Sequence, residues 1–143
     1  MNTQIKTPTW FTVVAILAII WNLMGIMAYL AQAFMPPEAL ESLKPEVQEA
    51  YKNVPAWATA AFALSVFGGF FGSLFLLLKK NIAKILLWIS LISIIINDFY
   101  NFIMIDSISL FGMSALYMQI IVLIVAILLV YLFNQAKNKH WIK

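Results

Sequence analysis

The sequence predicts an all-α polytopic membrane protein in which four transmembrane helices form one antiparallel bundle. Composition is the first reason: 64% of the 143 residues are hydrophobic and only 10% are charged, against roughly 45–50% and 25% in soluble domains. Four long stretches with almost no charge are the second, and the grouping of lysines around them is the third. The same composition excludes a disordered chain, which would be polar and poor in aromatic residues. The length suits a single domain, residues 1–143.

The predicted spans cover residues 10–34, 56–78, 82–105 and 110–133. Each is close to the roughly 20 apolar residues that a helix needs to cross about 30 Å of hydrocarbon. Strands of a membrane barrel would alternate apolar and polar residues and would be about half as long. Because a backbone in lipid must satisfy its own hydrogen bonds, these stretches are expected to be helices.

The distribution of charge predicts the orientation of the bundle. An even number of spans places seven lysines on one side, namely Lys6, Lys79, Lys80, Lys84, Lys137, Lys139 and Lys143. The other side has two lysines and five acids, namely Lys44, Lys52, Glu38, Glu41, Glu46, Glu49 and Asp106. Basic residues near helix ends favour the cytoplasmic side. We therefore expect both termini on the cytoplasmic side of the membrane.

A cleaved signal peptide is the alternative interpretation of the first span. Lys6 would form its basic start, and Ala31-Gln32-Ala33 resembles a cleavage site. The apolar run is about 24 residues long, however, whereas the apolar core of a signal peptide usually has about 7–15. We therefore expect the first span to be retained.

The first outer loop, residues 35–55, is long enough to fold by itself. Pro36, Pro37 and Pro45 can each begin a helix, because proline is tolerated at the first helical position. Apolar residues recur every three or four positions at Leu40, Leu43, Val47, Tyr51 and Val54. This spacing predicts one or two short amphipathic helices. They would form either a passive cap over the bundle or a lid over a pocket that opens outward.

The second predicted span carries a stripe of small residues, Gly68, Gly69, Gly72 and Ser73. Small side chains let two helix backbones approach closely, which favours helix association in lipid. This stripe therefore predicts a helix-packing face. The partner helix could belong to the same chain or to a second subunit.

Seven polar residues within the spans form the candidate pocket: Asn22, Tyr29, Gln32, Asn97, Asp98, Asn101 and Gln119. Asn22 would either make one interhelical hydrogen bond or contact a solute. Asp98 is the only acid within a span, and an ionisable residue there suggests function. It could equally lie near the outer interface and bond to its neighbours. A lining of amides and hydroxyls would suit an uncharged polar solute better than an ion.

Several residue types that carry chemistry are missing. The sequence contains no cysteine, and its one histidine, His140, lies in the tail after the fourth span. No phosphate-binding loop or nucleophile motif occurs. We therefore expect no enzyme activity, no cofactor and no metal. Nucleic-acid binding is not expected either, because it would need a denser basic patch.

Several motifs resemble a family of small bacterial four-span membrane proteins of uncharacterised activity, some of which carry the label sugar transporter. These motifs are Pro8-Thr9-Trp10, Trp21-Asn22-Leu23-Met24-Gly25, Ala28-Tyr29, Pro55-Ala56-Trp57-Ala58 and Phe67-Gly68-Gly69 with Gly72-Ser73. Size and span number are also loosely similar to DoxX-like proteins, which implies a quinone-linked redox accessory.

Three hypotheses follow: a permease or binding protein for a small uncharged solute, an accessory subunit that packs a partner helix on the Gly68/Gly72 face, and the quinone-linked accessory. Transport would need at least a homodimer.

Overall fold

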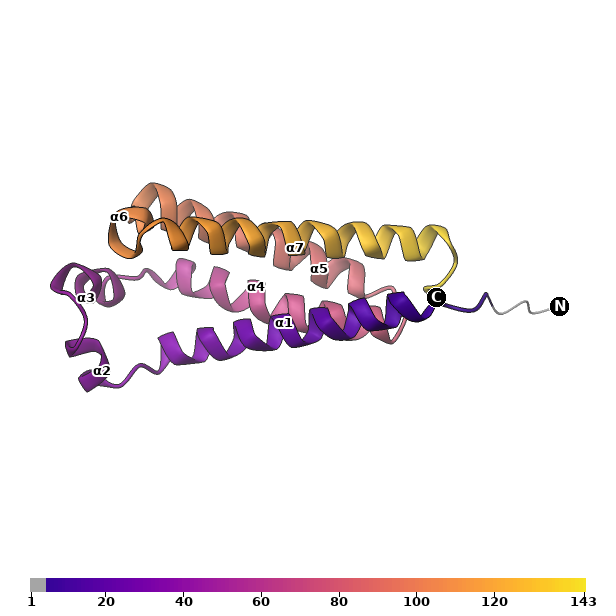
Figure 1. Cartoon of the computed structure of the whole chain (residues 1–143), viewed down its shortest axis with the longest axis horizontal. Coiled ribbons are helices and arrows are strands. Elements are labelled where there is room, and N and C mark those ends of the chain that lie inside the picture. The colour runs from indigo at the N-terminus through magenta and orange to yellow at the C-terminus, as the bar shows by residue number, and fades with distance from the viewer. Residues whose placement is uncertain (1–4) are drawn as a thin grey trace.

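The computed structural model describes residues 5–143, and this part of the chain is almost entirely helical (Figure 1). The elements in chain order are α1 (Thr9–Ala33), α2 (Pro37–Glu41), α3 (Pro45–Lys52), α4 (Ala56–Leu77), α5 (Ala83–Phe99), a π-helical turn η1 (Tyr100–Met104), α6 (Ser107–Phe111) and α7 (Met113–Asn138). Four of them, with η1 continuing α5, are long and apolar enough to cross a membrane. The predicted all-α bundle of four membrane-spanning helices is confirmed.

The four long helices lie side by side, with α4 and α5 as the central pair (Figure 1). α1 packs along α4, and α7 packs along α5, whereas α1 and α7 have almost no contact with each other. The buried apolar core lies mainly between α5 and α7 and extends to the tail, with Leu87, Leu129 and Phe133 among its members. The bundle is therefore held together by three helix pairs, and the fourth seam, between α1 and α7, is left loose.

The small residues of α4 pack inside the chain. A methyl group on Gly68 would lie 3.2 Å from the backbone oxygen of Leu86, and one on Gly72 would lie 2.8 Å from Cδ2 of Leu87. Only small side chains permit this closeness of α4 and α5. Ser73, from the same stripe, is fully buried. An accessory subunit would therefore have to use another surface than this one.

Two helix boundaries differ from the sequence prediction. The third span ends in η1, where the N–H of Ile105 donates to the carbonyl of Tyr100, five residues back (3.1 Å). The fourth begins at Met113 instead of residue 110, because Gly112 (φ 84°) separates it from the short α6. It continues beyond residue 133 to Asn138, since hydropathy marks the end of the apolar stretch and not the end of the helix.

The loop between α1 and α4 forms the two short helices that its prolines predict. Pro37 and Pro45 are the first residues of α2 and α3, where a missing N–H costs no helical hydrogen bond. Val47 of α3 is buried, and the ring of Tyr51 packs edge-on against Phe111 of α6 at 6.2 Å. α3 and α6 therefore meet over the end of the bundle opposite the C-terminus.

An aromatic cluster closes the opposite end. The ring of Trp141 packs edge-on against Phe11 at 5.5 Å and against Trp10 at 5.8 Å. The N–H of Lys143 donates to the carbonyl of Lys79 in the turn between α4 and α5 (3.2 Å). The tail therefore fastens the end of α7 to α1 and to the α4–α5 turn at this one end of the bundle.

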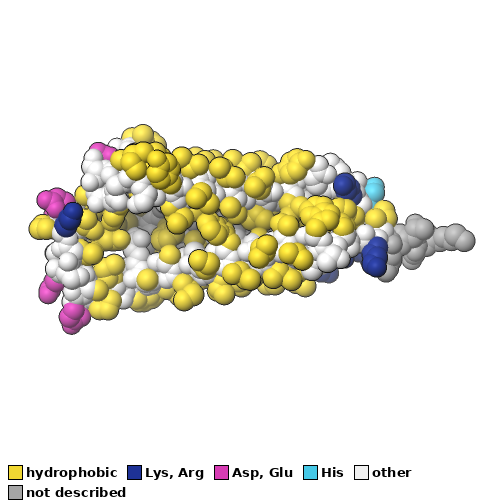
Figure 2. All heavy atoms as spheres, in the orientation of Figure 1, with side chains coloured by type: hydrophobic (Ala, Val, Ile, Leu, Met, Phe, Trp, Pro, Cys, Tyr) yellow, Lys and Arg dark blue, Asp and Glu magenta, His cyan; other side chains and the backbone are white. Residues whose placement is uncertain are grey.

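Charge is concentrated at the two ends of the molecule (Figure 2). Acidic side chains gather at the end formed by α2, α3 and α6, and lysines with His140 lie at the end that holds the described N-terminal segment and the C-terminus. Apolar side chains cover the surface between these ends. This band matches the hydrocarbon thickness, since 22 helical residues span about 33 Å.

Candidate functional site

A polar cavity of about 240 Å³ lies beneath α3 and α6, at the end of the bundle opposite the C-terminus, and is called the outer cavity. Four of the predicted pocket residues line it: Gln32, Asn97, Asn101 and Gln119. Thr59, Tyr100 and Ser107 add hydroxyl groups to the wall. Among the described residues that line this cavity, none is charged. The cavity therefore offers neutral hydrogen-bonding groups from α1, α4, α5 and α7.

Hydrogen bonds fix part of this wall. Asn101 Nδ2 donates to Asn97 Oδ1 at 2.8 Å, and Asn97 Nδ2 donates to the carbonyl of Ala58 on α4 at 3.4 Å. The π-helical turn begins at Tyr100, whose buried ring packs edge-on against Trp57 at 5.5 Å. π-helical turns occur frequently at functional sites. Here the turn contributes Tyr100 and Asn101 to the cavity wall, directly after Asn97 at the end of α5.

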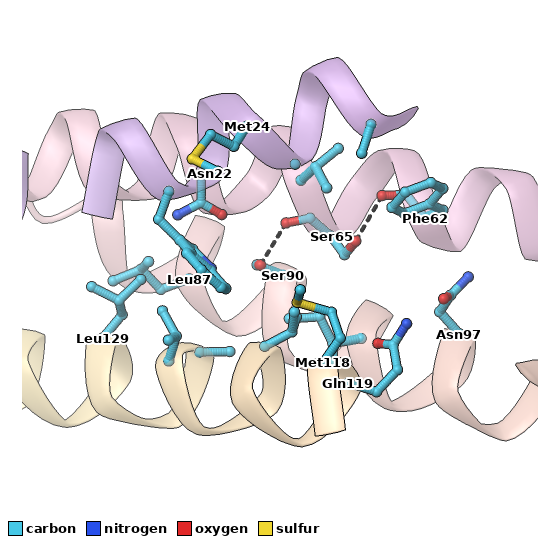
Figure 3. Close-up of a pocket in the computed structure, with 18 residues that line it drawn as sticks. Asn22, Met24, Phe62, Ser65, Leu87, Ser90, Asn97, Met118, Gln119 and Leu129 are labelled. Atoms are coloured by element: carbon cyan, nitrogen blue, oxygen red, sulfur yellow. Dashed lines mark hydrogen bonds between the residues drawn. The ribbon is translucent and has the colours of Figure 1, made fainter. Parts of the chain in front are cut away.

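A second cavity, the central cavity, is larger, with a volume of about 380 Å³, and lies deeper in the bundle (Figure 3). Its wall is mostly apolar and comes from all four long helices, with residues such as Met24, Ile94, Met118 and Val122. A few polar side chains interrupt this wall, namely Asn22, Ser65, Ser90, Asn97 and Gln119. Ser90 Oγ is already bonded to the carbonyl of Ser65 at 2.6 Å. Most of the hydrogen-bonding capacity of this cavity is therefore in its amides.

Asn22 makes the interhelical hydrogen bond that was one of the two roles expected from the sequence. Its Nδ2 donates to the carbonyl of Ala18 at 2.9 Å and to Ser73 Oγ on α4 at 3.4 Å, so it links two helices. Its Oδ1 lies directly over Gly69, where any Cβ would overlap it. The amide also forms part of the central cavity wall. Asn22 is thus a structural link that a bound molecule could also contact.

The two cavities meet at Phe62, Asn97 and Gln119, which line both. Figure 3 places Asn97 and Gln119 toward one end of the central cavity, on α5 and α7. Within the described residues, the Gln119 side chain makes no hydrogen bond, so both its N–H groups and its oxygen are available to a ligand. Gln119 is therefore the most accessible polar group at the junction.

Two predicted pocket residues lie elsewhere. Tyr29 packs edge-on against Phe62 at 5.5 Å and Phe67 at 6.0 Å, and it lines neither cavity. Asp98 also lines neither cavity. Its Oδ1 is buried without a hydrogen-bond partner within residues 5–143. One residue along a helix turns the side chain by about 100°, which separates Asp98 from Asn97.

Other lining residues escaped the sequence analysis. Tyr51 reaches the outer cavity from α3, and Tyr100 and Ser107 reach it from η1 and the start of α6. Tyr100 belongs to the polar run Asn97–Asn101, which was the available signal. Tyr51 was predicted only to lie on the apolar face of a short helix, and Ser107 gave no signal, because the placement of both depends on how these segments fold over the bundle.

Within residues 5–143, no three histidine or acidic side chains come together as a metal site would need. Comparisons with protein-family models, curated proteins and solved structures give no match.

Proposed function

We propose that this chain is a membrane protein that binds a small uncharged solute in the outer cavity. The main support for this proposal is the lining of the cavity. Amides and hydroxyls from four helices surround a volume of about 240 Å³, and no described lining residue is charged. A charged solute would have to give up its hydration without an opposite charge to replace it, which costs several kcal/mol. A neutral polyol or sugar would instead exchange water for amide and hydroxyl partners.

We further propose that the lysine-rich end faces the cytoplasm and the α2–α3 end faces outward, as the positive-inside rule requires. The site would then open to the outside of a bacterial inner membrane. Passage of a solute through the bilayer would need at least a second copy of the chain, because four spans are too few for two inverted repeats.

Thermal stabilisation of the purified protein tests solute binding. A ligand that binds only the folded state at 100 times its Kd stabilises it by about 2.7 kcal/mol. Glycerol, erythritol and glucose are the neutral probes, and gluconate and glucosamine are their charged counterparts. We expect at least one neutral probe, and neither charged one, to raise the melting temperature. The proposal is wrong if no neutral solute stabilises the protein.

The matched variants are Gln119→Leu and Gln135→Leu, both on α7. Gln119 lines the cavities, whereas Gln135 is near the far end of the helix and donates to the hydroxyl of Tyr131. We expect Gln119→Leu to abolish the stabilisation by solute and Gln135→Leu to retain it. Equal loss in both variants would show that the effect does not come from the outer cavity.

A further inference from the structure

The central cavity opens sideways, between α1 and α7. Met24 on α1 and Met118 on α7 both line it, although their side chains are 61% and 54% exposed. Side chains that are both lining and exposed stand at the mouth of a cavity. Figure 2 shows this face of the molecule, which is hollowed between α1 and α7 in the half nearer the acidic end. At this depth of a membrane the surroundings of the mouth are hydrocarbon.

The mouth is closed at one end only. Trp10, Phe11 and Trp141 join α1 to the tail of α7 at the lysine-rich end. Away from this cluster the backbones of α1 and α7 are in almost no contact, so the two helices stand apart at the level of the cavity. A molecule dissolved in the bilayer could therefore reach the central cavity without crossing the polar end of the bundle.

The two cavities differ in chemistry but share a junction. The central one is mostly apolar, and the outer one is rich in amides and hydroxyls. Phe62, Asn97 and Gln119 belong to both walls, so the polar and apolar spaces adjoin with no intervening helix. An apolar space of this size does not favour water, whereas it favours hydrocarbon groups. The pair of cavities therefore matches one molecule with a polar and an apolar part.

We propose that the ligand is an amphiphile with an uncharged polar head and an apolar chain, which enters from the membrane between α1 and α7. Its head occupies the outer cavity, where Asn97, Asn101 and Gln119 supply hydrogen bonds, and its chain lies in the central cavity. This inference rests on the proposed function and adds the lipid-like part and the route. The neutral lining excludes a phosphate or carboxylate head, which would bring an unpaired charge into the bundle.

A photoreactive monoacylglycerol tests this assignment. Its glycerol head is neutral, and a diazirine in the acyl chain inserts into whatever lies beside the chain on illumination. The protein is placed in phosphatidylcholine nanodiscs with this probe, illuminated and analysed by peptide mass spectrometry. Met24 and Met27 form an internal pair on α1: both are more than 60% exposed, but only Met24 lines the cavity. We expect at least five-fold more adduct at Met24 than at Met27.

Competition and a matched pair of variants define the site. Unlabelled monoacylglycerol should reduce the Met24 adduct to the Met27 level, whereas a fatty acid of equal chain length should not. Ala28 lines the mouth and Ala31 does not, although both are exposed on α1. Ala28→Trp should therefore reduce the adduct at Met24 several-fold, and Ala31→Trp should leave it unchanged. The primary ratio is measured on the unaltered chain, so the test does not depend on the folding of a variant.

Each outcome bears on the proposal. Equal labelling of Met24 and Met27 overturns the lateral route, and if neutral polyols still stabilise the protein, the outer cavity binds a water-soluble solute and the proposed function survives. If the fatty acid reduces the Met24 adduct as well as the unlabelled monoacylglycerol does, the inference of a neutral head is wrong. Preferential labelling that no amphiphile displaces shows that membrane lipid fills the cavity nonspecifically and also overturns the inference. Loss of polyol stabilisation alone contradicts the proposed function instead.

Discussion

Replacement of Gly69 by alanine tests the tightest contact between α1 and α4. The added Cβ would overlap Oδ1 of Asn22, whose Nδ2 is held by the carbonyl of Ala18 and by Ser73 Oγ. Overpacking of this kind costs about 1–3 kcal/mol. Displacing the amide also loses an interhelical hydrogen bond, which contributes about 0.6 kcal/mol on average. We expect Gly69→Ala to lower the free energy of unfolding by about 2 kcal/mol.

A double-mutant cycle gives the magnitude of this overlap. Asn22→Ala alone should cost about 1 kcal/mol, close to one interhelical hydrogen bond and some packing. In the double variant the amide is gone and the new methyl group occupies part of its space, so the total cost should also be about 1 kcal/mol. The coupling energy is then about −2 kcal/mol, within the range of residues in direct contact.

Equilibrium unfolding in mixed detergent and dodecyl sulfate micelles, followed by circular dichroism, measures these energies. Gly68→Ala is the matched control, because its Cβ would meet the carbonyl of Leu86 and not Asn22. Its cost should therefore add to that of Asn22→Ala within about 0.5 kcal/mol. Additive costs for Gly69→Ala and Asn22→Ala would refute the reasoning, because they would show that the two groups do not compete for one space.

Three further predictions concern other parts of the molecule. Asp98→Leu should raise the free energy of unfolding by about 1 kcal/mol, since it removes a buried oxygen without a partner; destabilisation in the same assay would reveal a partner for the carboxylate. Trp141→Ala should lower it by about 3 kcal/mol through the loss of its aromatic contacts, and an unchanged value would mean that the tail does not fasten the bundle. In intact cells, a membrane-impermeant maleimide should modify Ser42→Cys but not Asn138→Cys, and the reverse pattern would overturn the proposed orientation.

Local patterns in the sequence were sufficient for the helices themselves. The four spans, the helix starts at Pro37 and Pro45 and the close-packing stripe around Gly68 and Gly72 each depend on residues within a few turns of one another. The turn η1 and the separate helix α6 were not predictable. They depend on Gly112 and on the left-handed conformation of Asp106 (φ 49°), whose energies are set by packing over the bundle.

The polar site could be predicted only in outline. Asn97 and Gln119 line both cavities, and Gln32 and Asn101 line the outer one, because an amide that faced lipid would leave its polar groups unpaired at a high cost. Asp98 was the main functional candidate and lies outside both cavities. Its position one residue from Asn97 turns its side chain by about 100°, and the rotation of α5 that places Asn97 in the wall depends on which face of α5 receives the small residues of α4.

The loose seam between α1 and α7 follows from where the small residues are. Gly68 and Gly72 draw α4 against α5, and Gly69 leaves room for Asn22 of α1, so three helices approach closely. The wall that α7 contributes has no comparable stripe and carries large side chains such as Met118, Val122 and Leu129. Lipid supplies no hydrophobic force that would press α1 onto α7. A cavity therefore persists at this seam, and its amides make it a place where a membrane-soluble ligand gains hydrogen bonds that the hydrocarbon cannot offer.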